Sequence, residues 1–158
     1  LVEKKFKNKI YVKFGVMIET PRSALISEDI APFCDFFNYG TNDLTQMVYG
    51  LSRDDKSQFI EYYNEKNLFG IDPFSSIDQK GVGKLIESSL KKAKRSNDKL
   101  FVGVCGEHGG DPVSISFFSN QKFDYISCSP YRIPIAKLAA AQSNIILENR
   151  EKGIEIDT

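Results

Sequence analysis

The sequence predicts an α/β fold built from about four strand–helix units around a parallel sheet. Two observations lead to this prediction. Apolar, strand-like runs alternate along the chain with segments of helical character, and polar residues suited to chemistry follow the end of each run. Four such units are half of a (β/α)₈ barrel, or nearly a small doubly wound domain. Functional residues at strand ends favour the C-terminal half of a TIM barrel, although doubly wound folds also bind ligands there.

Four short runs rich in β-branched and aromatic residues are the expected strands. They read YVKFGVMI, CDFFNY, LFVGVC and FDYISC, and each gives way to a stretch of polar residues or glycine. Because a helical segment follows each run, we expect all four strands to be parallel. They cover Tyr11–Ile18, Cys34–Tyr39, Leu100–Cys105 and Phe123–Cys128.

Each expected strand is followed by a helix. Pro21 and Pro112 stand where a first helical turn accepts proline, and Asn42 or Asp43 could cap the helix after the second strand. The third helix has apolar residues at helical spacing and basic residues at its end, which complement the helix dipole. The expected helices run from Pro21 to about Phe33, from Asn42 or Asp43 to Val48, from Val82 to about Arg95, over a short stretch from Pro112, and from about Pro134 to Asn149, with 51–80 irregular.

Composition excludes several classes of function. The 21 Lys and Arg residues balance 21 Asp and Glu, so the net charge is zero and the basic excess of a nucleic-acid-binding protein is missing. No apolar stretch approaches the roughly 18 residues of a membrane span, and no apolar region of a secretory leader follows the basic start. We therefore expect neither a nucleic-acid nor a membrane partner.

The three cysteines, Cys34, Cys105 and Cys128, are an odd count at wide spacing. This pattern argues against a disulfide framework and indicates a reducing compartment. We expect a cytoplasmic location, with an organellar targeting signal upstream left open. The first residue is Leu1, not Met, which is a first indication that the chain is a piece of something longer. Residues 1–158 are expected to form a single, partial domain.

Two carboxylates follow consecutive expected strands. Glu19 ends the first strand, and Asp43 follows the second. In a parallel sheet both would lie on the same edge, within reach of one ion, and Mg²⁺ takes one or two carboxylates together with substrate oxygens and water. The local alternative is that Glu19 pairs with Arg22 while Asp43 simply caps a helix.

The turn after the second strand, Gly40-Thr41-Asn42-Asp43, could present backbone N–H groups to an anion. Arg53 lies ten residues beyond Asp43. Its guanidinium could place a bidentate fork on a phosphate or carboxylate. The alternative for Arg53 is a surface ion pair with one of the aspartates that follow it.

Cys105 ends the third strand and is followed by Gly106-Glu107-His108-Gly109-Gly110. A thiol in this position is often only a small apolar group. Held over a site at the sheet edge, it could instead give or take a proton, because surroundings tune its pKa. His108, the single histidine, could be a general base or a hydrogen-bonded structural residue.

Five ordered blocks between about Gly15 and Gln142 read GVMIETPRSAL, FFNYGTNDLTQMVYGLSRDD, DQKGVGKLIE, GVCGEHGGDP and YISCSPYRIPIAKLAAAQ. Through these blocks the chain resembles the phosphoenolpyruvate-utilising enzymes, and within them the pyruvate phosphate dikinases. The Gly-Glu-His-Gly-Gly-Asp run argues against phosphoenolpyruvate synthase and the phosphotransferase-system enzyme I.

The resemblance implies strands five to eight of a (β/α)₈ barrel that binds pyruvate or phosphoenolpyruvate with Mg²⁺. It implies that Cys105 is the acid/base that exchanges a proton with C3 of the enolate, and that Arg53 contacts the phosphoryl group. It implies Glu19 and Asp43 as Mg²⁺ ligands. The substrate-binding residues that it implies are Glu19, Gly40, Thr41, Asn42, Asp43 and Arg53.

The implied reaction interconverts ATP, phosphate and pyruvate with AMP, diphosphate and phosphoenolpyruvate. The phosphohistidine motif and the nucleotide-binding domain of the family are absent from this sequence. The implied partners are therefore a phosphohistidine domain of the same parent chain and a second copy in a homodimer. Alone, the chain is expected to be inactive and marginally stable. The alternatives are a synthase, the enzyme I, or a non-catalytic half-barrel that serves assembly.

Overall fold

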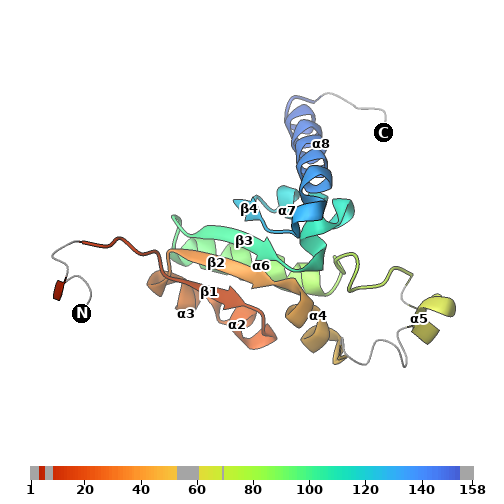
Figure 1. The fold of residues 1–158 in the computed structure, drawn as a ribbon, viewed down its shortest axis with the longest axis horizontal. Helices are drawn as coiled ribbons and strands as arrows, with labels where there is room; N and C mark the ends of the chain where they lie inside the picture. The colour runs from red at the N-terminus through yellow and green to blue at the C-terminus, as the bar shows by residue number, and fades with distance from the viewer. Residues whose placement is uncertain (1–3, 6–8, 53–60, 69, 154–158) are drawn as a thin grey trace.

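The computed structural model describes residues 4–5, 9–52, 61–68 and 70–153. Its centre is a parallel sheet with the strand order β1-β2-β3-β4 (Figure 1). The α/β prediction is confirmed. Strands that follow one another in sequence also lie side by side, whereas the order of a doubly wound sheet reverses at a switch point. The sheet is therefore consistent with half of a barrel. The strands are β1 (Gly15–Ile18), β2 (Phe36–Gly40), β3 (Phe101–Cys105) and β4 (Tyr125–Ile126).

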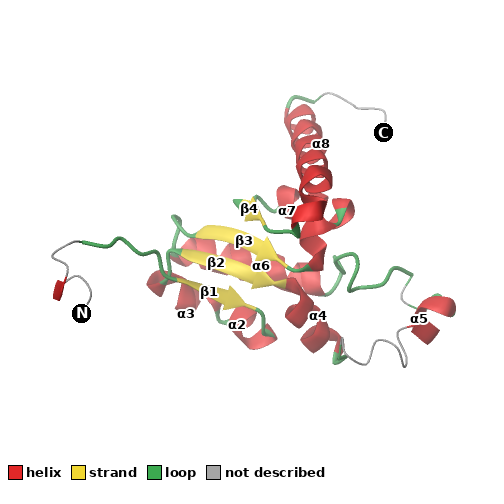
Figure 2. Cartoon of the chain, viewed as in Figure 1, coloured by secondary structure: helices red, strands yellow, loops and turns green. Residues whose placement is uncertain are grey.

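Helical segments connect the strands, as Figure 2 shows. None of the described helices has the length and apolar character needed to cross a bilayer. The α-helices are α2 (Pro21–Leu25), α3 (Ser27–Ile30), α4 (Thr41–Tyr49), α5 (Glu61–Glu65), α6 (Val82–Ser96), α7 (Pro112–Asn120) and α8 (Ile133–Glu151), and the 3₁₀ helices are η1 (Ala31–Phe33), η3 (Glu107–Gly110) and η4 (Pro130–Arg132).

The prediction of a single helix from Pro21 to about Phe33 is wrong, because the segment is divided into α2, α3 and η1. Ile26 ends α2 with φ −102° and ψ 23°, outside helical geometry. Pro32 lies in the first turn of η1, where no N–H is needed for a helical hydrogen bond. Because proline has no N–H, an α-helix that started earlier could not continue through Pro32 without losing a hydrogen bond. Residues 51–80, expected to be irregular, include the short helix α5.

The outer strands are shorter than expected. The first expected strand begins at Tyr11, but pairing with β2 starts only at Gly15, opposite Phe36. Tyr11 is 93% exposed and has no neighbouring strand to pair with. At the other edge, β4 contains two residues, which pair with Gly103 and Val104 of β3.

Helices cover one face of the sheet. In Figure 1, α6 lies behind β2 and β3, and no described element crosses in front of these strands. Alternate strand residues point toward the helices and are buried, including Ile18, Phe37, Tyr39, Val102 and Val104. With residues of α6 and α7 they form the core, as the period of two in strands requires.

The opposite face of the sheet is open. Met17 on β1 is 43% exposed and Phe101 on β3 is 45% exposed, although both are large apolar residues within strands. The Phe101 ring stacks on the ring of Tyr125, with the ring centroids 5.4 Å apart. Parallel sheets are normally covered on both faces, so a second apolar face without cover among the described residues is unusual.

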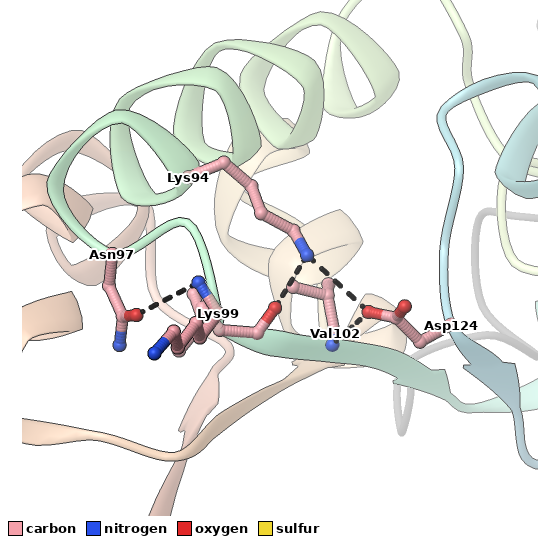
Figure 3. Close-up of polar contacts among 6 residues, drawn as sticks. Lys94, Asn97, Lys99, Val102 and Asp124 are labelled. Atoms are coloured by element: carbon pink, nitrogen blue, oxygen red, sulfur yellow. Dashed lines mark hydrogen bonds and ion pairs between the residues drawn. The ribbon is translucent and has the colours of Figure 1, made fainter.

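A polar cluster ties the start of β3 to α6 and β4 (Figure 3). The Asp124 carboxylate accepts a hydrogen bond from the Val102 backbone N–H at 2.7 Å. Lys94 reaches from α6 to the Leu100 carbonyl oxygen and lies 3.5 Å from the same carboxylate. Because Asp124 directly precedes β4, this cluster sets where the two-residue strand joins the sheet.

We predict that Asp124→Ala lowers the free energy of unfolding by about 1–2 kcal/mol, because a partly buried N–H loses its charged acceptor. Denaturant titration of the 158-residue chain measures this loss. Asp98→Ala, on the exposed turn before β3, is the matched control. Equal free-energy changes in the two variants would contradict the assigned role of Asp124.

Candidate functional site

The carboxyl ends of three neighbouring strands meet at one edge of the sheet. The arrowheads of β1, β2 and β3 all point to the side where α4 begins (Figure 1). Glu19 directly follows β1, Gly40 ends β2 and Cys105 ends β3, and Gly40 pairs with Cys105 in the register. The structure thus brings together residues that the sequence places up to 86 positions apart, from Glu19 to Cys105.

Glu19 packs against the end of β2. A Cβ atom on Gly40 would lie 2.8 Å from the Glu19 Cβ and 3.2 Å from its Oε2, so a larger residue would push the carboxylate away. Within the described part of the chain, Glu19 makes no ion pair with Arg22, the local alternative considered from the sequence. Glu19 is therefore placed over the strand ends.

Asp43 lies in the first turn of α4, half-buried. It does not cap that helix. The N-cap residue is Gly40, with no side-chain capping bond, so the sequence-based expectation of a cap at Asn42 or Asp43 is wrong. The Asp43 Oδ1 atom accepts a hydrogen bond from the Gln46 side chain at 3.1 Å. The carboxylate is held by a neighbour on the next turn.

Glu19 and Asp43 suit a hard divalent cation. Both carboxylates act electrostatically on the Cys105 thiol, so both lie at the same rim. The described residues contain no group of three or more His, Cys, Asp or Glu side chains that could hold a metal on their own. Mg²⁺ usually binds one or two carboxylates and completes its shell with substrate oxygens and water. The donor set therefore fits Mg²⁺ better than a metal that needs a full protein cage.

The Cys105 thiol is half-buried at the centre of the rim. Its sulfur lies 3.7 Å from the Tyr39 carbonyl oxygen and 3.7 Å from the Met17 sulfur. Burial raises the pKa of this thiol above the ordinary 9.0, and the charges of Glu19 and Asp43 raise it further, while a hydrogen bond from the Asn38 side chain lowers it. The thiol is therefore protonated at neutral pH and available as an acid.

The turn after β2 is fastened to the loop after β3. The Thr41 hydroxyl donates to the Cys105 carbonyl oxygen at 3.0 Å. The Asn42 amide donates to the Glu107 carboxylate, and the Glu107 backbone N–H donates back to the Asn42 side-chain oxygen at 3.3 Å. Thr41 and Asn42 are thereby held beside Cys105.

Gly106 makes this contact between the two loops possible. Its φ is +113°, a backbone conformation open essentially to glycine alone. A Cβ atom there would lie 2.7 Å from the Thr41 hydroxyl and 2.9 Å from the Asn42 side-chain oxygen. The glycine thus lets the β3 loop approach the β2 turn closely.

We predict that Gly106→Ala lowers the free energy of unfolding by about 2–3 kcal/mol, since backbone strain adds to the steric clash. Chemical denaturation measures the change. Gly50→Ala is the matched control, because Gly50 has φ +65° but open space around its Cβ position. If both substitutions cost the same, the contacts with Thr41 and Asn42 contribute nothing.

A cavity of about 780 Å³ opens beside Cys105. Arg132, from η4, reaches it over Gly110, whose Cβ position would lie 3.0 Å from the Arg132 Cγ. Of the described residues that line the cavity, Arg132 is the single cationic one. The cavity is lined by Asn42, Phe74, Ser75, Cys105, Gly106, Glu107, Gly110, Asp111, Ser127, Cys128, Ser129 and Arg132.

The sequence reasoning missed two residues of this region. Arg132 follows the Ser127-Cys128-Ser129 strand end, and an arginine three residues past such an end is a usable signal. Asn38 is an amide inside an aromatic strand, and its Oδ1 is buried without a hydrogen-bond partner among the described residues. A buried amide in a strand indicates a functional or structural polar contact. Arg53 lies outside the described residues.

Comparisons with known proteins agree with the sequence-based resemblance. A family model described as the PEP-binding domain of PEP-utilising enzymes matches residues 1–145. The chain is 53% identical over 144 residues to a pyruvate, phosphate dikinase of Rickettsia bellii, covering 91% of this chain and 16% of that protein. It is 55% identical over 130 residues to a chloroplastic pyruvate, phosphate dikinase of Flaveria trinervia, covering 82% of this chain and 14% of that protein. The chain thus spans about one sixth of the length of these relatives.

Proposed function

This chain belongs to the PEP-binding domain family of the PEP-utilising enzymes, and from that premise we propose that it is the substrate-binding part of a pyruvate phosphate dikinase. The whole enzyme would interconvert ATP, phosphate and pyruvate with AMP, diphosphate and phosphoenolpyruvate. The observation that carries the proposal is the meeting of Glu19, the Gly40–Asp43 turn and the Cys105 thiol at one edge of a parallel sheet.

Cys105 would exchange the proton at C3 of the substrate. When pyruvate forms, the S–H bond breaks as a C–H bond forms at C3 of the enolate, and a thiolate remains. In the reverse direction the thiolate takes a proton from the methyl group and the enolate forms. The raised pKa of the thiol supports the donor role, because the proton is present at neutral pH.

The turn after β2 would orient the substrate. The first N–H groups of α4 have no side-chain cap and suit an anionic oxygen. Asn42 is held by Glu107 on the same rim, and Arg53 would contact the phosphoryl oxygens. Fixed donors of this kind cost no reorganisation when charge develops, which is the usual source of electrostatic catalysis.

Glu19 and Asp43 would hold Mg²⁺, whose chemistry there is to stabilise the negative charge on the enolate oxygen. Both residues are spaced on neighbouring strand ends, and both face the rim that contains Cys105. Two protein carboxylates would leave the remaining coordination to substrate and water, as Mg²⁺ prefers.

The open face of the sheet supports a proposal about the remainder of the fold. Met17 and Phe101 on that face are exposed in this chain. Four further strand–helix units of a longer parent chain would close a (β/α)₈ barrel over them, with 1–158 as its C-terminal half. A phosphohistidine domain of the same chain, a homodimeric partner and a cytoplasmic location complete the proposal.

A chimera tests the proposal. Residues 1–145 of this chain would replace the matched segment of the Rickettsia bellii dikinase, to which the chain is 53% identical. The chimera would receive phosphoenolpyruvate, AMP, diphosphate and Mg²⁺, and ATP formation would be followed. ATP formation that disappears on omission of diphosphate supports the proposal.

A chimera that melts like the parent enzyme and still forms no ATP would favour the alternative of a non-catalytic half-barrel. Each chimera is therefore checked by thermal unfolding and by its elution volume before the assay. The unmodified Rickettsia enzyme is the positive control for every substrate omission.

A further inference from the structure

The single histidine of the chain is buried beside the proposed site and hydrogen-bonded on both ring nitrogens. His108 is 0% exposed. Its Nδ1 lies 2.7 Å from the Thr41 hydroxyl, and its Nε2 lies 2.8 Å from the Pro73 carbonyl oxygen. The imidazole therefore joins three segments: the loop after β3, the start of α4 and the segment before α6.

The Thr41 hydroxyl also contacts Cys105. Thr41 is 0% exposed, and its hydroxyl donates to the Cys105 carbonyl oxygen at 3.0 Å. The His108 Nδ1 and the Cys105 carbonyl oxygen thus both lie within hydrogen-bond distance of the Thr41 hydroxyl, and the second contact is on the backbone of the residue whose thiol occupies the rim. Gly106 keeps Thr41 close, because no side chain separates the two loops.

The hydrogen atoms available for the contacts among His108, Thr41 and Cys105 can be counted. A carbonyl oxygen only accepts, so the Pro73 contact places a hydrogen on the His108 Nε2. Burial lowers the pKa of His108, which favours a neutral ring, although the bond to Pro73 and the nearby carboxylates raise it in part. In the neutral ring Nδ1 carries no hydrogen, so it shares the single Thr41 hydrogen with the Cys105 carbonyl oxygen.

The Thr41 hydroxyl has one hydrogen and two acceptors within reach, the His108 Nδ1 and the Cys105 carbonyl oxygen. The position of the Cys105 backbone is therefore coupled to the imidazole. Removing the ring would leave the Cys105 carbonyl oxygen as the remaining acceptor and so change the contact with the Cys105 backbone, and a misplacement of about 1 Å at a reacting group can cost about 100-fold in rate.

We propose that His108 is a positioning residue, which acts through the Thr41 hydroxyl to hold the Cys105 thiol in place for proton transfer. His108 does not reach the substrate in this arrangement, since both ring nitrogens are already engaged within the protein. The proposal deepens the proposed function and rests on it, because proton transfer by Cys105 is part of that function. The contacts among His108, Thr41 and Cys105 do not depend on the proposed function.

Thiol alkylation tests the coupling without any substrate. The 158-residue chain is treated with iodoacetamide, and mass spectrometry follows Cys34, Cys105 and Cys128 separately. His108→Gln keeps a donor for Pro73 but cannot hold Thr41. We expect the rate of Cys105 alkylation in this variant to differ at least about 3-fold from wild type, because the contact of Thr41 with the Cys105 backbone changes. Cys34 and Cys128 report general unfolding and should keep their rates.

A double-mutant cycle separates positioning from a structural role. Thr41→Val removes the hydroxyl, and Thr41→Ser retains it. If His108 acts through Thr41, Cys105 is alkylated in the double variant His108→Gln/Thr41→Val at the same rate as in Thr41→Val alone, and Thr41→Ser behaves like wild type. Additive effects, an unchanged Cys105 rate, or an equal change in the rates of all three thiols would overturn the proposal.

The chimera links this result to the proposed function. There, His108→Gln should lower kcat at least about 10-fold with little change in the KM for phosphoenolpyruvate, because orientation and not binding is lost. An unmodified chimera that forms no ATP would contradict the proposed function alone and leave the alkylation result intact. A kcat equal to that of the unmodified chimera would overturn the positioning role.

Discussion

Replacing Cys105 by alanine in the chimera is expected to slow pyruvate formation by about 100-fold or more, since a positioned acid contributes roughly 10²–10⁴-fold. The thiol lies between Tyr39 and Met17 at the rim, and alanine leaves no group there that can donate a proton. The measurement is the rate of pyruvate release from phosphoenolpyruvate. The KM should change less than kcat, because the lost interaction belongs to the proton transfer.

Cys34→Ala is the matched control for this substitution. Cys34 is half-buried against the core before β2, at the opposite end of the strands. The Cys34→Ala variant should lose little activity, and any loss it shows measures the general effect of removing a thiol from this fold. Equal losses of activity in the two variants would contradict a role of Cys105 in proton transfer.

The raised pKa of Cys105 predicts opposite pH dependences for the two directions of reaction. Pyruvate formation needs the thiol, and burial raises its pKa, so the rate should persist through neutral pH and fall as the thiol ionises at alkaline pH. Proton removal from pyruvate needs the thiolate and should increase over the same pH range. Rate profiles in both directions, with Cys105→Ala as the baseline, measure this. Profiles that move in the same direction with pH would contradict the prediction.

The order and type of the principal elements could be predicted because apolar periodicity distinguishes strands from helices. The boundaries depended on neighbours that the sequence does not reveal. Among the described residues Tyr11 belongs to a strand-like run but finds no partner strand, and β4 pairs with β3 through two residues only. The break at Ile26 likewise lies inside a segment whose pattern is compatible with a continuous helix.

Part of the site could be predicted from one geometric rule. Parallel strands end at the same edge, so Glu19, Gly40 and Cys105 were expected to meet, and Gly40 does pair with Cys105. The contact of His108 with Pro73 could not be predicted, because it depends on the path of a loop 35 residues away in sequence. Residue type and position proposed the roles of Cys105 and Arg53 beside plain structural alternatives, and the family resemblance favoured those roles over the alternatives.

Asp43→Asn is expected to raise the Mg²⁺ concentration for half-maximal activity of the chimera by at least about 10-fold, because even outer partners of metal ligands are worth 10–100-fold. The amide keeps the size of the side chain and can still contact Gln46, so the change removes mainly charge. Mg²⁺ titration of the initial rate is the measurement. Asp29→Asn, on the exposed surface of α3, is the matched control and should leave the titration unchanged.

The same substitution has a second consequence that needs no metal. The charge of Asp43 raises the pKa of Cys105, so Asp43→Asn should lower that pKa and move the pH midpoint of Cys105 alkylation downward. Glu19→Gln should act in the same direction, because its charge also raises the pKa of Cys105. A lower alkylation midpoint without a weaker Mg²⁺ requirement would place Asp43 beside the thiol but outside the metal shell. An unchanged midpoint would mean that Asp43 does not face Cys105, and that a single ion could not be shared as proposed.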